Sequence, residues 1–201
     1  MPRRAGTWNH NTYHHAGLLR LVPAAVARAL DVGCGDGTFA AKLASRCRLV
    51  EALDADAQQV AATRARCRGL GNVRAYQADF LKADLPASAF DLVTGLAAFH
   101  HMPFDDALRS AIRILRPGGR LLLLGVWTDT ESASDMVLNL VSTGHNLGLR
   151  ALRGPDEMSS PQTMPTMSLL EVRQVVHSRL PGATIRRGSL WRYILTWDKP
   201  S

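Results

Sequence analysis

The segment ALDVGCGDGTFAAKLA places three glycines at alternate positions between an apolar run and a helical pattern. Glycine adopts positive φ values without strain and leaves room for a ligand against the main chain. Gly33, Gly35 and Gly37 therefore predict a strand–loop–helix unit that binds a ligand through its backbone N–H groups. Asp31 precedes them and completes the pattern DxGxGxG.

Apolar runs and helical patterns alternate from about residue 28 to residue 126. This alternation is typical of a mostly parallel α/β sheet with helices on both faces. We expect strands in five segments, which read RALDVG, RLVEALD, NVRAYQAD, FDLVTGL and GRLLLLGVW. Asp56 is expected to cap a helix that follows the second strand and runs to about Arg68.

The clearest predicted helix lies between the fourth and fifth strands, in MPFDDALRSAIRILRPGG. Its apolar residues fall on one face, and two aspartates occupy its first turn. We expect Arg113 and Arg116 near its end and the PGG sequence at 117–119 to stop it.

The C-terminal part predicts one more helix, over about 168–180, and then two strands that turn at Gly188 and Ser189. Period-two spacing puts four residues on one face of the last strand. These are Trp191, Tyr193, Leu195 and Trp197.

The length of 201 residues, with 46% hydrophobic residues, fits a single domain over residues 1–201. No segment approaches the roughly 20 apolar residues of a membrane-spanning helix, and the three cysteines lack the spacing of a zinc site. We therefore expect a cytoplasmic protein with no structural metal and no membrane partner. The net charge of +7 permits an acidic partner, but the arginines are spread over several predicted helices, so nucleic acid is disfavoured.

The glycine spacing distinguishes between two classes of cofactor. A dinucleotide-binding loop reads GxGxxG, so that a helix N-terminus faces the pyrophosphate. Here the third glycine comes one residue early and Thr38 stands in its place, which argues against a nicotinamide cofactor. The pattern suits a ligand with no phosphate and a positive amino group, held by Asp31 directly or through water.

These features resemble the class I S-adenosylmethionine-dependent methyltransferases of the small-molecule type, over about Trp8 to Trp197. The resemblance implies a Rossmann-like, seven-stranded, mostly parallel sheet whose last strand is antiparallel. It also implies S-adenosylmethionine as cofactor. The lack of an HxxxH, HExxH or paired-carboxylate pattern near the 127–168 segment disfavours a catalytic metal.

The resemblance assigns cofactor contacts at four successive strand ends. Asp54 matches the acidic residue that accepts both ribose hydroxyls, and Ala55 lies at the adenine edge. Asp79 and Phe80 match the pair beside the adenine, and the segment from Leu96 passes under the sulfonium. The glycine loop, which cradles the methionine part, consists of Asp31, Gly33, Cys34, Gly35 and Gly37.

Each match also has a plainer interpretation. Asp54 alone suits a helix cap, Asp79 suits a turn, and His100 and His101 suit a surface pair. Their joint placement favours the cofactor site, because open parallel sheets bind ligands at the carboxyl ends of their strands.

Two further segments are assigned by their position. Residues 1–27 are expected to cover the cofactor, with Trp8 and His14 as contacts, although a helix packed on the sheet explains them equally well. Residues 127–168, rich in Met, Pro and Ser, are expected to form a substrate lid with one helix.

The predicted reaction is methyl transfer to oxygen or nitrogen of a small molecule or peptide. His101 or His100 is the candidate base, and His145 in the lid is a more distant one. Two rivals stay open: an RNA methyltransferase, and a non-catalytic protein that binds the cofactor for a partner. The oligomeric state is not predicted.

Overall fold

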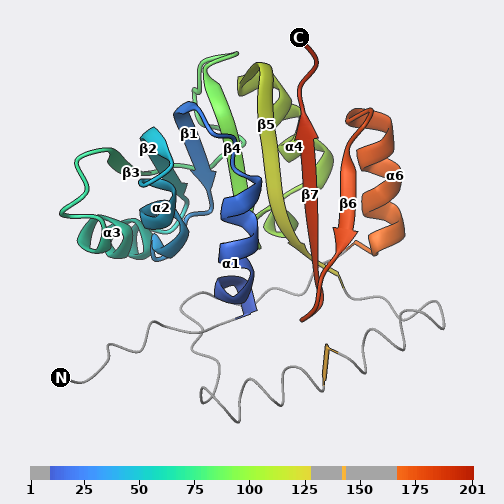
Figure 1. Cartoon of the computed structure of the whole chain (residues 1–201), viewed down its shortest axis with the longest axis horizontal. Helices are drawn as coiled ribbons and strands as arrows, with labels where there is room; N and C mark the ends of the chain where they lie inside the picture. Colours follow the sequence, from blue (N-terminus) through green and yellow to red (C-terminus); the bar gives the residue numbers. More distant parts are fainter. Residues whose placement is uncertain (1–9, 128–141, 144–166) are drawn as a thin grey trace.

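The computed structural model describes residues 10–127, 142–143 and 167–201. Its seven-stranded sheet has the order β3-β2-β1-β4-β5-β7-β6 (Figure 1). Strands β1 to β5 are mutually parallel, while β7 runs antiparallel to both β5 and β6, as predicted. The strands are β1 (Val26–Val32), β2 (Cys47–Asp54), β3 (Val73–Gln77), β4 (Phe90–Leu96), β5 (Leu115–Val126), β6 (Thr184–Arg187) and β7 (Arg192–Asp198).

Helices cover both faces of this sheet, which confirms the predicted layers (Figure 1). Leu18, Phe39 and Leu43, from α1 and α2, belong to the core of one face, and α4 and α6 close the other. No helix within the described ranges is long and apolar enough to cross a membrane. The helices are α1 (His10–Leu21), α2 (Thr38–Leu43), α3 (Ala57–Arg66), α4 (Phe104–Ile114) and α6 (Leu169–Arg179), with a 3-10 turn η1 (Phe99–His101).

Helix α4 ends earlier than predicted. The chain becomes extended at Leu115, which pairs with Phe90, so the PGG sequence lies inside β5 rather than at the helix end. Arg116 therefore belongs to the strand and forms an ion pair with Asp91. Pro117 disfavours the helical conformation of Arg116, the residue before it, so the helix has to end before Arg116.

The C-terminal hairpin confirms two strands but corrects the position of Trp191. Leu190 and Trp191 have φ values of 61° and 56°, so both lie in the turn before β7. Their left-handed conformation interrupts the period-two alternation that was expected to include Trp191. The remaining predicted residues, Tyr193, Leu195 and Trp197, are buried on one face.

Helix α6 begins as predicted, and its start is stabilised by a capping box. Ser168 accepts a hydrogen bond from the backbone N–H of Glu171 at 3.1 Å, and Glu171 accepts one from the backbone N–H of Ser168 at 2.7 Å. These two bonds satisfy donors that a helix N-terminus otherwise leaves without partners.

Candidate functional site

The glycine loop follows β1 at the carboxyl end of the sheet, toward which β1 points in Figure 1. Gly33, Gly35 and Gly37 have φ values of 64°, 56° and 77°, a region that disfavours residues with a Cβ. At Gly33 a Cβ would lie 2.5 Å from the Cβ of Ala98, in the segment after β4. The first glycine thus allows the ends of two central strands to approach each other.

Asp31 is buried beside this loop, with 2% of its surface exposed. Its Oδ1 accepts a hydrogen bond from the Thr94 hydroxyl at 2.7 Å, whereas its Oδ2 is buried and has no hydrogen-bond partner in the described part of the chain. Burial is the main reason that the pKa of Asp31 is raised from 3.8 to about 7; the Thr94 hydrogen bond opposes this rise and the nearby Asp54 adds to it. A buried carboxyl oxygen without a donor is costly, so it suits a ligand that brings a cationic donor.

Asp54 ends β2, and its carboxylate links the end of this strand to the glycine loop and to the start of α3. Its Oδ2 accepts a hydrogen bond from the backbone N–H of Gly35 at 2.9 Å, and its Oδ1 accepts one from the N–H of Asp56 at 3.0 Å. A carboxylate has about four lone-pair sites, so both oxygens retain capacity for ligand hydroxyls. Ala55, which is exposed beside Asp54, accepts a hydrogen bond from the Gln77 side chain at 3.0 Å.

The two predicted adenine neighbours after β3 lie in different environments. Asp79 is exposed, accepts a hydrogen bond from the N–H of Leu81 at 3.0 Å and pairs with Lys82, which lowers the pKa of its carboxyl. Phe80 is buried, with its ring 5.9 Å from the ring of Phe99. Phe80 therefore connects the end of β3 to the segment after β4, while Asp79 makes the contacts of a turn residue.

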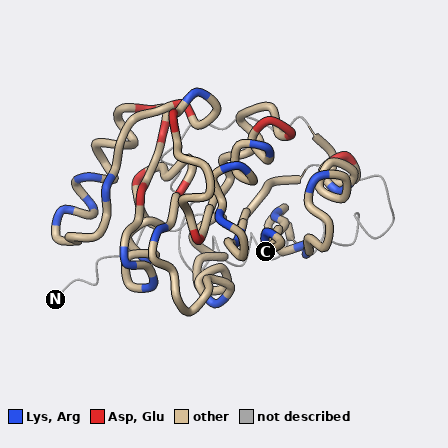
Figure 2. Tube along the Cα trace, turned by 90° about the horizontal axis from the view of Figure 1, so that it is seen from above, with Lys and Arg blue, Asp and Glu red and all other residues tan. Residues whose placement is uncertain are grey.

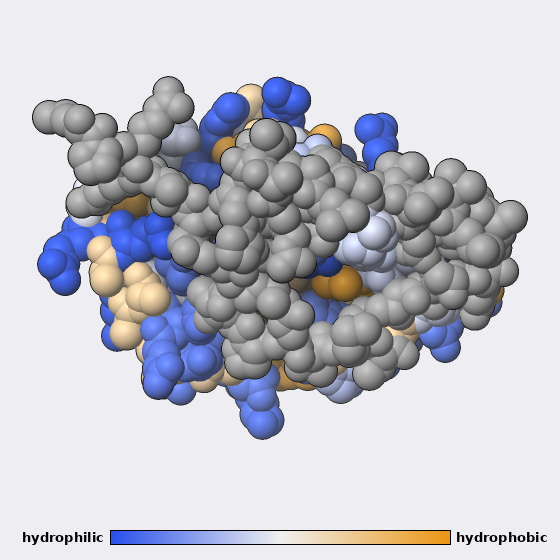
Figure 3. All heavy atoms as spheres, turned by 90° about the horizontal axis from the view of Figure 1, so that it is seen from below, coloured by the Kyte–Doolittle hydropathy of each residue, from blue (hydrophilic) through white to orange (hydrophobic). Residues whose placement is uncertain are grey.

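The segment after β4 bends sharply at the end of the sheet. Leu96 ends the strand, Ala97 has a φ of 52°, and its N–H donates to the carbonyl of Leu124 in β5 at 2.7 Å. In η1 the rings of His100 and His101 lie 4.0 Å apart, with His101 exposed and His100 half-buried. Figure 3 views this end of the sheet, where a small hydrophobic area is visible beside hydrophilic residues near the centre.

Of the two N-terminal residues predicted to contact the cofactor, only His14 lies within the described residues. His14 is buried in α1, and its Nε2 lies 3.1 Å from the carbonyl oxygen of Ser189 in the turn between β6 and β7. In sheet order this turn is separated from β1, and so from the glycine loop, by β4 and β5. Trp8, His145 and most of the 127–168 segment lie outside the described residues.

Several residues of the site were not predicted. Thr94 is a polar residue inside the apolar run of β4. Its position could have predicted a buried hydrogen-bond partner for Asp31. Thr63 and Arg66 in α3 contact the glycine loop, but nothing in their local sequence marks them.

Comparison with known proteins identifies the class of this site. Residues 29–119 match a family described as Methyltransferase domain. An uncharacterized methyltransferase of Mycobacterium tuberculosis is 36% identical over 197 residues, which cover 96% of this chain and 98% of that protein. A ribosomal RNA small subunit methyltransferase C of Chromohalobacter salexigens is 38% identical over 119 residues, covering 53% of this chain and 35% of that protein.

A solved structure shares the fold along most of both chains. The N-methyltransferase NodS from Bradyrhizobium japonicum, in complex with S-adenosyl-L-homocysteine, has a TM-score of 0.64 at 17% identity and covers 96% of this chain and 89% of that one. The sheet order, the glycine loop and a relative matched along nearly its whole length lead to one conclusion: the chain belongs to the class I S-adenosylmethionine-dependent methyltransferases.

Proposed function

We propose that the protein transfers the methyl group of S-adenosylmethionine to an oxygen or nitrogen atom of a small molecule or peptide. The observation that carries the cofactor part is the buried Oδ2 of Asp31, which has no partner among the described residues. Beside the glycine loop it is suited to the amino group of the cofactor. Asp54 would accept the ribose hydroxyls, and Phe80 would lie against the adenine.

The reaction requires positioning more than it requires a base. The bound cofactor supplies a methyl group that is already a strong electrophile. The protein must then hold the acceptor lone pair in line with the methyl carbon, at about 3 Å. A hydroxyl acceptor loses its proton during transfer, and His101 is exposed after β4, where it can receive that proton.

If His101 is the base, replacing it by Asn should lower the turnover number of a hydroxyl acceptor by about 100-fold or more. Asparagine keeps a polar side chain of similar reach but does not titrate. Affinity for S-adenosylhomocysteine should stay unchanged, because the ring is assigned to the acceptor and not to the cofactor. Steady-state kinetics of the His101→Asn variant measure this, and equal turnover would leave His101 a structural residue.

The distribution of charge favours a small acceptor over RNA. Basic residues occur on several elements and are interspersed with acidic ones (Figure 2). Six arginines of the described residues are already paired inside the chain, and a paired arginine contributes less to a phosphate-binding surface. They are Arg28, Arg66, Arg109, Arg116, Arg120 and Arg179.

Two competing functions make different predictions. An RNA methyltransferase would bind RNA with an affinity that falls steeply as salt rises. A non-catalytic protein would bind the cofactor, but would produce no S-adenosylhomocysteine with any acceptor and would need a second chain.

Calorimetric titration with S-adenosylhomocysteine, with NAD as the control ligand, tests the proposal. We expect micromolar binding of the first and no binding of the second, because the early third glycine leaves no pyrophosphate site. Binding of NAD alone, or of neither ligand, would contradict the cofactor assignment. Release of S-adenosylhomocysteine with hydroxyl and amine acceptors then tests the transfer step.

A further inference from the structure

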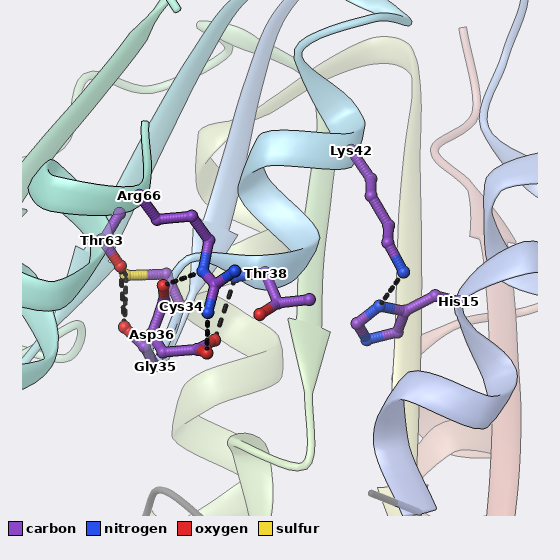
Figure 4. Close-up of polar contacts among 8 residues, drawn as sticks. All are labelled: His15, Cys34, Gly35, Asp36, Thr38, Lys42, Thr63 and Arg66. Carbon is purple, nitrogen blue, oxygen red and sulfur yellow. Dashed lines mark hydrogen bonds and ion pairs between the residues drawn. The ribbon is translucent and has the colours of Figure 1, made fainter. Parts of the chain in front are cut away.

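Two side chains of α3 bind the carbonyl groups of the glycine loop (Figure 4). The Thr63 hydroxyl donates to the carbonyl oxygen of Gly35 at 2.7 Å. The Arg66 guanidinium donates through Nε to the carbonyl oxygen of Asp36 at 2.8 Å and through Nη2 to its Oδ2 at 2.6 Å. Two successive carbonyls of the loop are therefore held by one helix face.

Thr63 also packs directly against the loop. It has no exposed surface, and a Cβ built on Gly37 would lie 2.8 Å from its side chain. The φ of 77° at Gly37 and the absence of a side chain thus let α3 approach. The N–H of Gly35, whose carbonyl binds Thr63, donates to Asp54.

Asp36 connects this contact to the next helix. Its Oδ1 accepts a hydrogen bond from the N–H of Thr38, the first residue of α2, at 3.0 Å, while its Oδ2 binds Arg66. Burial acts to raise the pKa of Asp36, but the hydrogen bonds from Thr38 and then the ion pair with Arg66 outweigh it and lower the pKa, so Asp36 stays ionised at neutral pH. Arg66 thereby fixes both the backbone and the side chain of the central loop residue.

We propose that Thr63 and Arg66 are positioning residues that hold the loop carbonyls toward α3, so that the loop presents its open glycine side to the methionine part of the cofactor. The physical reason is electrostatic. A carbonyl oxygen turned toward the ligand would repel the cofactor's carboxylate and occupy the space that the glycines leave. This inference rests on the proposed function, because it assigns the loop to that part of the cofactor.

Substitutions of Thr63 and Arg66 test the inference. Thr63→Val keeps the shape of the side chain but leaves the Gly35 carbonyl without its donor, and Thr63→Ser restores the hydroxyl. Arg66→Ala removes the Asp36 contacts, and Arg66→Lys keeps only the charge. Arg64→Ala is the matched control, because Arg64 lies on the same helix but donates to Ala75 in β3, at 3.0 Å.

The measurement compares two ligands by calorimetry. S-adenosylhomocysteine carries the amino-acid part that the loop is assigned to bind, and adenosine lacks it. We expect Thr63→Val and Arg66→Ala to weaken the binding of S-adenosylhomocysteine by about five- to tenfold, which corresponds to the loss of one or two hydrogen bonds. The affinity of the same two variants for adenosine should change by less than about twofold. Thr63→Ser should recover native affinity, and Arg64→Ala should retain it.

The outcomes separate this inference from the proposed function. If the native protein does not bind S-adenosylhomocysteine, the proposed function fails and the inference with it. If it binds but the Thr63→Val and Arg66→Ala variants bind equally well, only the inference is overturned. The inference is also overturned if the affinities for both ligands fall equally, or if Thr63→Ser does not recover native affinity. A general loosening of the fold would produce either result.

Discussion

Replacing Asp54 by Ala should weaken binding of S-adenosylhomocysteine by about 1–3 kcal/mol, a factor of about 5 to 150. The carboxylate is proposed to accept the ribose hydroxyls, and hydrogen bonds to a charged acceptor are among the stronger ones. It also accepts the backbone N–H groups of Gly35 and Asp56, at 2.9 Å and 3.0 Å. The variant therefore loses both a ligand contact and a bond that holds the glycine loop. Calorimetric titration measures the change.

Asp84→Ala serves as the control, because Asp84 is an exposed aspartate in the loop between β3 and β4. It should bind S-adenosylhomocysteine as the native protein does. Native affinity in the Asp54→Ala variant would remove Asp54 from the cofactor site. Asp79→Ala should have a small effect, since the carboxylate of Asp79 contacts its own neighbours Leu81 and Lys82.

The sheet and the glycine loop were predictable because each depends on information that is local in the sequence. The run FDLVTGL was predicted as a strand and forms β4 with the same bounds. Gly33, Gly35 and Gly37 were predicted to form a loop between a strand and a helix, and all three have positive φ values. Parallel strands that are buried on both faces give continuous apolar runs, and these fix the order of elements along the chain.

Other features were not predictable because they depend on contacts between distant residues. Thr63 and Arg66 have the same sequence character as other polar helix residues, and only the packing of α3 brings them to the glycine loop. The hydrophobic pattern of α4 also continued past its true end, because Leu115 suits a helix face as well as a strand. Trp191 was misplaced because the alternation of a strand does not reveal where left-handed residues begin.

The affinity for S-adenosylhomocysteine should rise with pH and level off above about pH 8. The free protein holds Asp31 with a pKa of about 7, so below that value the buried carboxyl is neutral and does not attract an ammonium group. Above it the carboxylate is charged and the attraction is complete. Near pH 6, binding should therefore expel a proton, which calorimetry detects as a binding enthalpy that differs between phosphate and Bis-Tris buffers. Methylthioadenosine, which lacks the amino group, should show no such difference.

The Asp31→Asn variant should gain stability at the same pH at which it loses affinity. Because the pKa of Asp31 is raised from 3.8 to about 7 on folding, ionisation in the unfolded chain lowers stability progressively between these two values, and the cost is complete above pH 7. Asparagine removes that cost, which amounts to up to about 4 kcal/mol, so thermal unfolding should occur at a higher temperature at pH 8 and change little at pH 4. The same variant should bind S-adenosylhomocysteine at least about tenfold more weakly at pH 8, with no pH dependence left. A variant that is no more stable at pH 8 would contradict the buried, uncompensated carboxylate, whereas a stable variant with native affinity would show that the cofactor's amino group binds elsewhere.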